Sequence, residues 1–127
     1  WNEVITEALY KGAKNTLLDH NVAEENIERI DVPGSFELIY GASQAQQKYF
    51  DAIIAIGCIV QGETRHFEFI SNAVAHGIKD LNLNHKAPVV FCVLTDDTLE
   101  QSKSRSGGDK GNKGVEAAVT ALRMIAL

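Results

Sequence analysis

The sequence predicts an α/β protein in which helices cover both faces of a short parallel sheet. Three observations lead to this prediction: helical and extended patterns alternate along the chain, residues 52–60 read AIIAIGCIV, and residues 88–94 read PVVFCVL. Uninterrupted apolar runs of this length are typical of strands buried on both faces, as parallel strands under helices are. The alternation then implies βαβ units and a three-layer αβα sandwich.

Each element is predicted from the spacing of its apolar residues. The expected helices are 4–18, a stripe through 38–45, 66–81, a short one after 97 and a last one through 115–125, and the expected extended segments are 27–32, 52–60 and 88–94. Asp97 with Glu100 three residues later resembles a capping box at the start of the short helix. Three strands make a thin sheet, so we expect a further strand before Trp1. Residues 1–127 are expected to form one domain.

Composition limits the classes of function. The chain has 127 residues with a formal charge of −5, and it contains no basic stripe, so a nucleic-acid binder is not expected. No apolar run reaches the roughly 18 residues of a spanning helix, and the chain opens without a signal-peptide pattern, so neither a spanning helix nor a signal peptide is expected. The two cysteines, Cys58 and Cys92, lie in apolar runs and lack metal-site spacing, which favours buried free thiols and a cytoplasmic protein.

Ligands of parallel α/β sheets bind where strands end and loops lead into helices. This rule selects the loops 32–37, 61–66 and 95–98. In the second loop, Gly62 permits a ligand to approach the backbone, and free amides around Thr64 form an anion cradle. The simpler alternative is that Thr64 only caps the helix. His66 follows in the first turn, where the helix dipole disfavours its protonated form, which makes it a candidate base or a merely structural histidine.

Two other segments allow a functional and a structural interpretation. In Pro33–Glu37, Ser35 and Glu37 could bind a polyol, or the segment is only a turn before a helix. The stretch Gly107–Gly114 lacks the Gly-Lys-Ser/Thr of a phosphate-binding loop. It is either a solvated loop or a mobile loop that delivers Lys113, with Arg105 just upstream.

The acidic group Asp96, Asp97 and Glu100 could suggest a metal site. Capping explains two of the three carboxylates, so no metal is predicted. No cofactor is expected either.

The order and spacing of these motifs resemble the 6,7-dimethyl-8-ribityllumazine synthase family from Trp1 to the C-terminus. The matching segments are Trp1-Asn2, PGSFE (33–37), AIIAIGCIVQGETRHFEFI (52–70), VVFCVLTDDTLEQ (89–101), R-(x)7-K with GNKG (105–114) and Glu116-Ala117-Ala118. The resemblance implies a flavodoxin-like sheet of four strands. Its first strand would precede Trp1 and lie between the first two strands seen in this sequence.

The resemblance also implies a transferase of riboflavin biosynthesis and a set of site residues. The reaction would condense 5-amino-6-(D-ribitylamino)uracil with 3,4-dihydroxy-2-butanone 4-phosphate to give the lumazine, phosphate and water. The catalytic residues would be His66, for proton transfer, and Arg105, at the phosphate. Substrate-binding positions would be Trp1 and Asn2 at the ring, Gly34, Ser35, Phe36 and Glu37 at the ribityl chain and ring edge, Ile59 and Val60 at the heterocycle, Gly62, Glu63 and Thr64 at the phosphate, and Phe91 and Lys113.

Family members assemble as pentamers, and twelve pentamers form an icosahedral 60-subunit shell in some of them. The resemblance implies at least a pentamer in which Phe91, Arg105 and Lys113 enter the site of a neighbouring subunit. Riboflavin synthase is a further conceivable partner. Gln61 departs from the pattern, because many relatives carry Arg there, so a secondary contact near the phosphate is in doubt.

Two rival functions remain. A non-catalytic flavin- or lumazine-binding or shell-forming relative would keep the aromatic stack without the phosphate and proton-transfer residues. A riboflavin synthase on the same fold would need no phosphate site. The presence of Thr64, His66, Arg105 and Lys113 favours the lumazine synthase over both.

Overall fold

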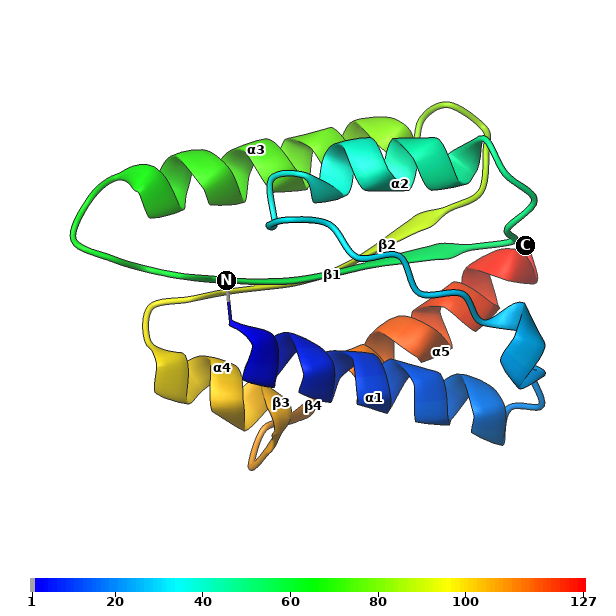
Figure 1. Ribbon diagram of the computed structural model, residues 1–127, viewed down its shortest axis with the longest axis horizontal. Coiled ribbons are helices and arrows are strands. Elements are labelled where there is room, and N and C mark those ends of the chain that lie inside the picture. Colours follow the sequence, from blue (N-terminus) through cyan, green and yellow to red (C-terminus); the bar gives the residue numbers. More distant parts are fainter. Residues whose placement is uncertain (1) are drawn as a thin grey trace.

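The computed structural model describes residues 2–127 and arranges them in three layers (Figure 1). The central layer is a parallel pair of strands, β1 (Ile53–Val60) and β2 (Val89–Asp96). On one side lie α2 (Leu38–Gln46) and α3 (His66–Leu81); on the other lie α1 (Glu3–Asp19), α4 (Leu99–Arg105) and α5 (Lys113–Ile125). The predicted αβα sandwich is therefore confirmed. Trp1, which the resemblance assigns to the site, lies outside the described residues.

The register of the two strands brings their carboxyl ends to the same level. Ile53 pairs with Val89 at one end, and Val60 pairs with Asp96 at the other. The loops that follow β1 and β2 therefore leave the sheet side by side, at the left of Figure 1. This edge is where parallel α/β sheets bind their ligands.

Alternate side chains of the strands build two cores. Cys58, Cys92 and Leu94 pack with Leu9 of α1 and with Ala117 and Ala121 of α5. Ala55, Ile59 and Val93 pack with Val74 and Ile78 of α3 on the other face. Both faces of each strand are covered, which explains why the two strands read as uninterrupted apolar runs.

The segment 27–32 was expected to be a strand, and this prediction was wrong. It follows a 3-10 turn, η1 (Glu24–Asn26), and runs extended without strand pairing. A groove of about 800 Å³ lies between it and β1, lined by Ile27–Val32 and Ile53–Ile56 among others. A strand requires hydrogen-bonded neighbours, and the groove keeps this segment away from β1. The groove separates the two segments between which the resemblance expects an additional strand.

Arg29 anchors this extended segment to α1. Its guanidinium is paired with Glu7 of α1 and with Asp31, 2.8 Å away, and it stacks 4.6 Å from the ring centroid of Tyr10. The hydrogen bonds from Arg29 lower the pKa of the Glu7 carboxyl, although desolvation opposes them. The segment is therefore held in place by side chains rather than by a strand ladder.

Two local predictions need correction. The capping box is formed by Thr98 and Gln101: the Gln101 N–H donates to Thr98 Oγ1 at 3.2 Å, and the Thr98 N–H donates to Gln101 Oε1. It was predicted one residue too early because β2 continues to Asp96 instead of ending at Leu94. The glycine-rich stretch forms a small hairpin, β3 (Ser106–Gly108) and β4 (Gly111–Asn112), in which Gly107 and Gly111 have positive φ. The helix 66–81, by contrast, has the predicted bounds.

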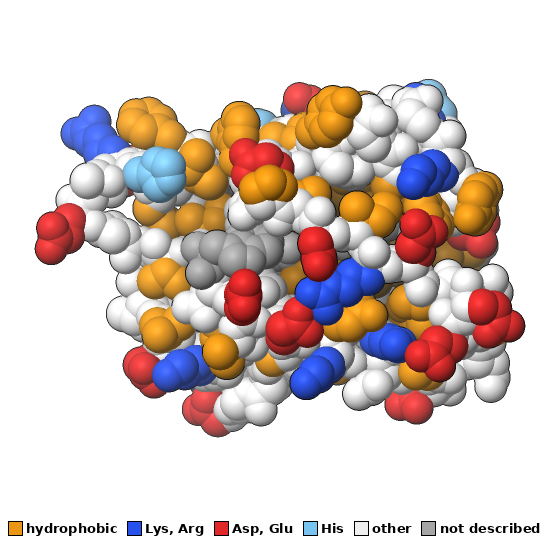
Figure 2. All heavy atoms as spheres, viewed as in Figure 1, with side chains coloured by type: hydrophobic (Ala, Val, Ile, Leu, Met, Phe, Trp, Pro, Cys, Tyr) orange, Lys and Arg blue, Asp and Glu red, His pale blue; other side chains and the backbone are white. Residues whose placement is uncertain are grey.

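The surface carries mixed charges. On the face shown in Figure 2, acidic and basic side chains are interspersed, and hydrophobic side chains reach the surface between them. Within residues 2–127, no helix is long and apolar enough to cross a membrane.

Candidate functional site

The carboxyl edge of the sheet gathers the predicted loops. The Gln61 N–H donates to the Asp96 carbonyl at 3.0 Å, so the loop after β1 is tied to the end of β2. The loop before α2 also reaches the sheet, because a Cβ on Gly57 would lie 2.8 Å from Ser35 Oγ. Asn2 is the N-cap of α1. One edge of the fold therefore holds most of the residues predicted for the ring, the ribityl chain and the phosphate.

The loop between β1 and α3 is exposed from Gln61 through His66. Its helix has Arg65 as N-cap, without a side-chain capping bond, so the interpretation of Thr64 as the N-cap was wrong. Thr64 Oγ1 instead accepts the His66 N–H at 3.3 Å. Gly62 has no atom within 4 Å of the place where a Cβ would stand. The loop therefore presents backbone amides at a helix start with open space around them, which is the arrangement that binds anions.

The turn Gly34–Glu37 supplies a buried hydroxyl. Ser35 is 8% exposed, and its Oγ has no hydrogen-bond partner among the described residues. Buried polar atoms normally have partners, so such an atom calls for an explanation. Phe36 is 52% exposed, and Glu37 is the N-cap of α2 without capping through its side chain. Within residues 2–127, the Ser35 hydroxyl thus has no hydrogen-bond partner and the Glu37 side chain makes no capping bond.

A second group of predicted residues lies on the outer edge of β2. A hollow of about 610 Å³ there is lined by Phe91, Asp96, Arg105, Lys113 and Glu116, among other residues between 82 and 124. None of the residues 33–37 or 59–66 is among those that line it. The hollow therefore brings Phe91, Arg105 and Lys113 together, and none of the loop residues 33–37 or 59–66 lines it.

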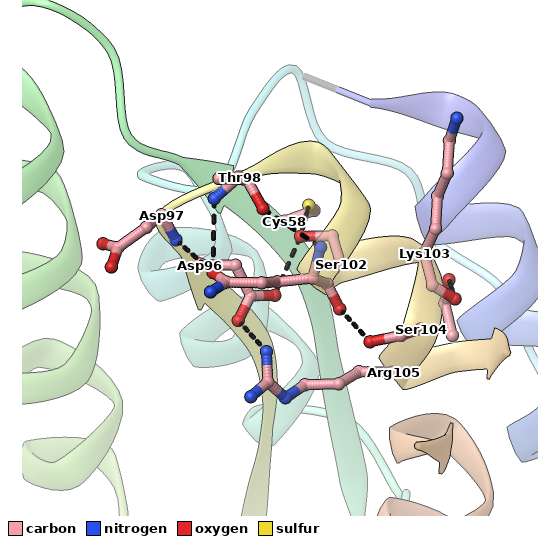
Figure 3. A network of polar contacts seen from close by, with 10 residues as sticks. Cys58, Asp96, Asp97, Thr98, Ser102, Lys103, Ser104 and Arg105 are labelled. Atoms are coloured by element: carbon pink, nitrogen blue, oxygen red, sulfur yellow. Dashed lines mark hydrogen bonds and ion pairs between the residues drawn. The ribbon is translucent and has the colours of Figure 1, made fainter. Parts of the chain in front are cut away.

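Arg105 is held by a buried acidic residue (Figure 3). Its Nη1 donates to Asp96 Oδ1 at 2.6 Å, and the other carboxylate oxygen, Oδ2, accepts the Ser102 hydroxyl at 2.8 Å. The Cys58 thiol donates in turn to Ser102 Oγ at 3.4 Å. Asp96 is 8% exposed and Ser102 fully buried. Sequence analysis missed this role of Asp96; an acidic residue at the last position of a strand, facing a helix with an arginine, was the available signal.

Lys113 lies at a helix start and not in a mobile loop, which corrects the prediction. It is the first residue of α5, and its Nζ lies 3.2 Å from Glu116 Oε1, one turn along the helix. Asn112 caps the helix by accepting the N–H groups of Gly114 and Val115. The position of Lys113 is therefore fixed by a capped helix.

The two cysteines are buried and unbridged. Desolvation raises the pKa of the Cys92 thiol to about 12, and it also raises the pKa of Cys58. Both thiols are therefore protonated at neutral pH and unsuited to nucleophilic catalysis. Among residues 2–127, no three His, Cys, Asp or Glu side chains are grouped so that they could hold a metal ion.

Fold and loop positions together define a flavodoxin-like α/β protein with a candidate anion site at the carboxyl edge of its sheet. Comparison with known proteins gives the family. The chain matches the family profile of 6,7-dimethyl-8-ribityllumazine synthase over residues 1–127. The chain belongs to this family of transferases.

Curated relatives agree with this assignment. The 6,7-dimethyl-8-ribityllumazine synthase of Christiangramia forsetii is 54% identical over all of this chain and 77% of its own length. The enzymes of the same name from Flavobacterium johnsoniae and Cytophaga hutchinsonii are each 56% identical. They are matched over 98% and 99% of this chain and over 66% and 80% of their own lengths.

Proposed function

We propose that this protein condenses 5-amino-6-(D-ribitylamino)uracil with 3,4-dihydroxy-2-butanone 4-phosphate to give 6,7-dimethyl-8-ribityllumazine, phosphate and water. Membership of the family supports the proposal directly. The structural observation that supports it is that the chain has two features suited to binding a phosphate. These are the exposed backbone amides at the start of α3, in residues 62–66, and the guanidinium of Arg105. The alternative, a non-catalytic protein that binds lumazine or forms a shell, is not favoured, because the relatives of this chain at 54–56% identity are named as the enzyme.

The site residues are assigned by chemistry. Ser35 and Glu37 would hydrogen-bond the ribityl chain and ring edge, with Gly34 and Phe36 beside them. Ile59 and Val60, at the end of β1, would face the heterocycle, as would Asn2 and, from the resemblance, Trp1. Gly62, Glu63 and Thr64 would hold the phosphate through the backbone at the start of α3. Lys113 would contact a ring carbonyl.

The reaction needs no enzyme nucleophile. An amine of the pyrimidinedione adds to the ketone, phosphate is eliminated, and the second amine closes the ring. Holding two reactants in attacking geometry can contribute roughly 7–11 kcal/mol to lowering the barrier. His66, exposed at the first position of α3, would move protons beside the phosphate loop.

We infer further that the active unit is a ring of at least five copies. The number of copies is what the family resemblance implies. A site shared between copies is supported by the hollow that Phe91, Arg105 and Lys113 line, because none of the loop residues 33–37 or 59–66 lines it. A neighbouring copy would bring the two groups together. Light scattering during size-exclusion chromatography would distinguish a pentamer from a 60-subunit shell by mass. The same measurement with riboflavin synthase added would show whether the two proteins associate. The free buried thiols favour a reducing cytoplasm as its location.

One experiment tests the proposed function. The protein is mixed with both substrates, and lumazine fluorescence and phosphate release are recorded together. Equal amounts of both products are expected. Binding of lumazine without turnover would contradict the proposal, and so would lumazine formation without phosphate release.

A further inference from the structure

We propose that Asp96 is a positioning residue that presents the Arg105 guanidinium to the phosphate of the second substrate. The inference rests on the proposed function, which gives Arg105 its ligand. The inference goes beyond the proposed function because it gives the Asp96 carboxylate a role that neither the sequence motifs nor their spacing had given it.

The Asp96 carboxylate is held in place by hydrogen bonds to both of its oxygens. Asp96 ends β2, and both of its oxygens are occupied: Oδ1 accepts from Arg105 Nη1 at 2.6 Å and Oδ2 from the Ser102 hydroxyl at 2.8 Å. Ser102 is fully buried and accepts in turn from the Cys58 thiol. Because strand, helix and hydroxyl all limit the carboxylate, it can hold a long arginine side chain in one orientation.

The guanidinium is only partly committed. Nη1 is the one Arg105 nitrogen with a hydrogen-bond partner among residues 2–127, so Nη2 and Nε keep their donors for a ligand. The Arg105 side chain is 37% exposed, against 9% for Asp96. A planar guanidinium that is bound along one edge can still bind an oxyanion along another. The pair therefore leaves Arg105 accessible while it removes the rotamer freedom that binding would otherwise cost.

Asp96 also touches the phosphate loop of its own chain. Its carbonyl accepts the Gln61 N–H at 3.0 Å. The same residue thus anchors the start of the loop through its backbone and Arg105 through its side chain. Side-chain variants of Asp96 leave this backbone bond in place, so they alter only the side-chain bonds to Arg105 and Ser102.

The test is a double-mutant cycle. Asp96→Ala should raise the KM for the phosphate substrate about tenfold, the loss expected when a charge-assisted hydrogen bond is removed. The KM for the pyrimidinedione should change by less than about twofold, because only one substrate carries phosphate. In the Arg105→Ala background, Asp96→Ala should have no further effect, because the carboxylate acts through the guanidinium.

Graded variants separate positioning from folding. Asp96→Asn keeps an oxygen that can accept from Arg105, so it should restore most of the affinity lost in Asp96→Ala. Ser102→Ala should weaken binding in the same direction by about two- to threefold, because it frees the carboxylate. Asp80→Ala is the matched control: it breaks the 2.7 Å ion pair with Lys79 near the end of α3 and should leave both KM values unchanged.

Calorimetry with inorganic phosphate supplies a readout without turnover. The dissociation constant of phosphate should rise in Asp96→Ala by the same factor as the KM. An unchanged or tighter affinity in Asp96→Ala and Asp96→Asn would overturn the inference. An equal loss in the Arg105→Ala background would overturn it as well. A wild-type protein that formed no lumazine would contradict the proposed function, while the phosphate measurement would still decide the role of Asp96.

Discussion

Gly114 of α5 lies directly against the backbone of Leu9 in α1. A Cβ on Gly114 would stand 1.9 Å from the Leu9 carbonyl oxygen and 2.8 Å from its carbonyl carbon. Because the obstacle is helix backbone, it cannot move aside as a flexible side chain could. The two helices pack so closely only because this position carries no side chain.

We therefore predict that Gly114→Ala destabilises the fold. Ala is the better helix former, but the steric clash should outweigh this gain and cost about 3 kcal/mol. The thermal midpoint, measured at fixed protein concentration, should fall by several degrees. Gly62→Ala is the control, because no atom lies within 4 Å of its added Cβ. Equal midpoints for the two variants would contradict the close packing.

His66→Ala should slow the enzyme without abolishing it. A positioned proton-transfer group typically contributes 10²–10⁴-fold, whereas the alignment of the two substrates does not depend on the imidazole. Turnover is measured by lumazine fluorescence, after circular dichroism has shown that the variant is folded. His76→Ala changes an exposed histidine on the same helix and should leave the rate unchanged. Complete loss in a folded His66→Ala protein would count against this division of labour.

Arg105→Ala should chiefly weaken the binding of the phosphate substrate. We expect its KM to rise about tenfold or more, because charge-assisted hydrogen bonds to the phosphate are lost. Steady-state kinetics with each substrate varied in turn would show the difference. Lys110→Ala, which removes a charge from the turn of the β3–β4 hairpin, is the control. An unchanged KM in Arg105→Ala would refute the phosphate role.

Both cysteines should resist thiol reagents in the native protein. Burial raises the pKa of Cys92 to about 12 and also raises that of Cys58, so the reactive thiolate is scarce at pH 8. Unfolding returns both groups to a thiol pKa of about 8.5, and the thiolate fraction then rises with pH through that value. Reaction with a chromogenic disulfide is expected only in denaturant. Fast labelling of the native protein would contradict the burial.

Gln46 should stabilise the amino-terminal end of the sheet without affecting catalysis. Its Nε2 donates to the carbonyls of Leu81 and Ala87, and its Oε1 accepts from Asn84. Gln46→Ala leaves these groups without their hydrogen-bond partner and should lower the free energy of unfolding by about 2 kcal/mol. Denaturant titration measures the loss, and Gln44→Ala, an exposed position on the same helix, is the control. A change in either KM would contradict a purely structural role.

Hydrophobic spacing predicted most of the elements because it acts locally. The helix 66–81 was predicted with its observed bounds, and the strand predicted at 52–60 begins one residue later, at Ile53. The prediction of a strand at 27–32 failed because these extended, partly apolar residues have no neighbouring strand to pair with among residues 2–127. The capping box was predicted at Asp97 instead of Thr98 because the end of β2 could not be read from apolarity once polar Thr95 and Asp96 continued the strand.

The sequence by itself determined the layered fold and, through its motifs, the family. Periodicity and residue types near turns are properties of neighbouring residues, and they survive without any knowledge of the third dimension. Only the tertiary structure decided that Asp96 holds Arg105, that Gly114 lets α1 and α5 pack closely, and that Lys113 is the first residue of a helix. Each of these depends on which backbones approach one another, and close packing fixes that approach only when the whole chain is folded.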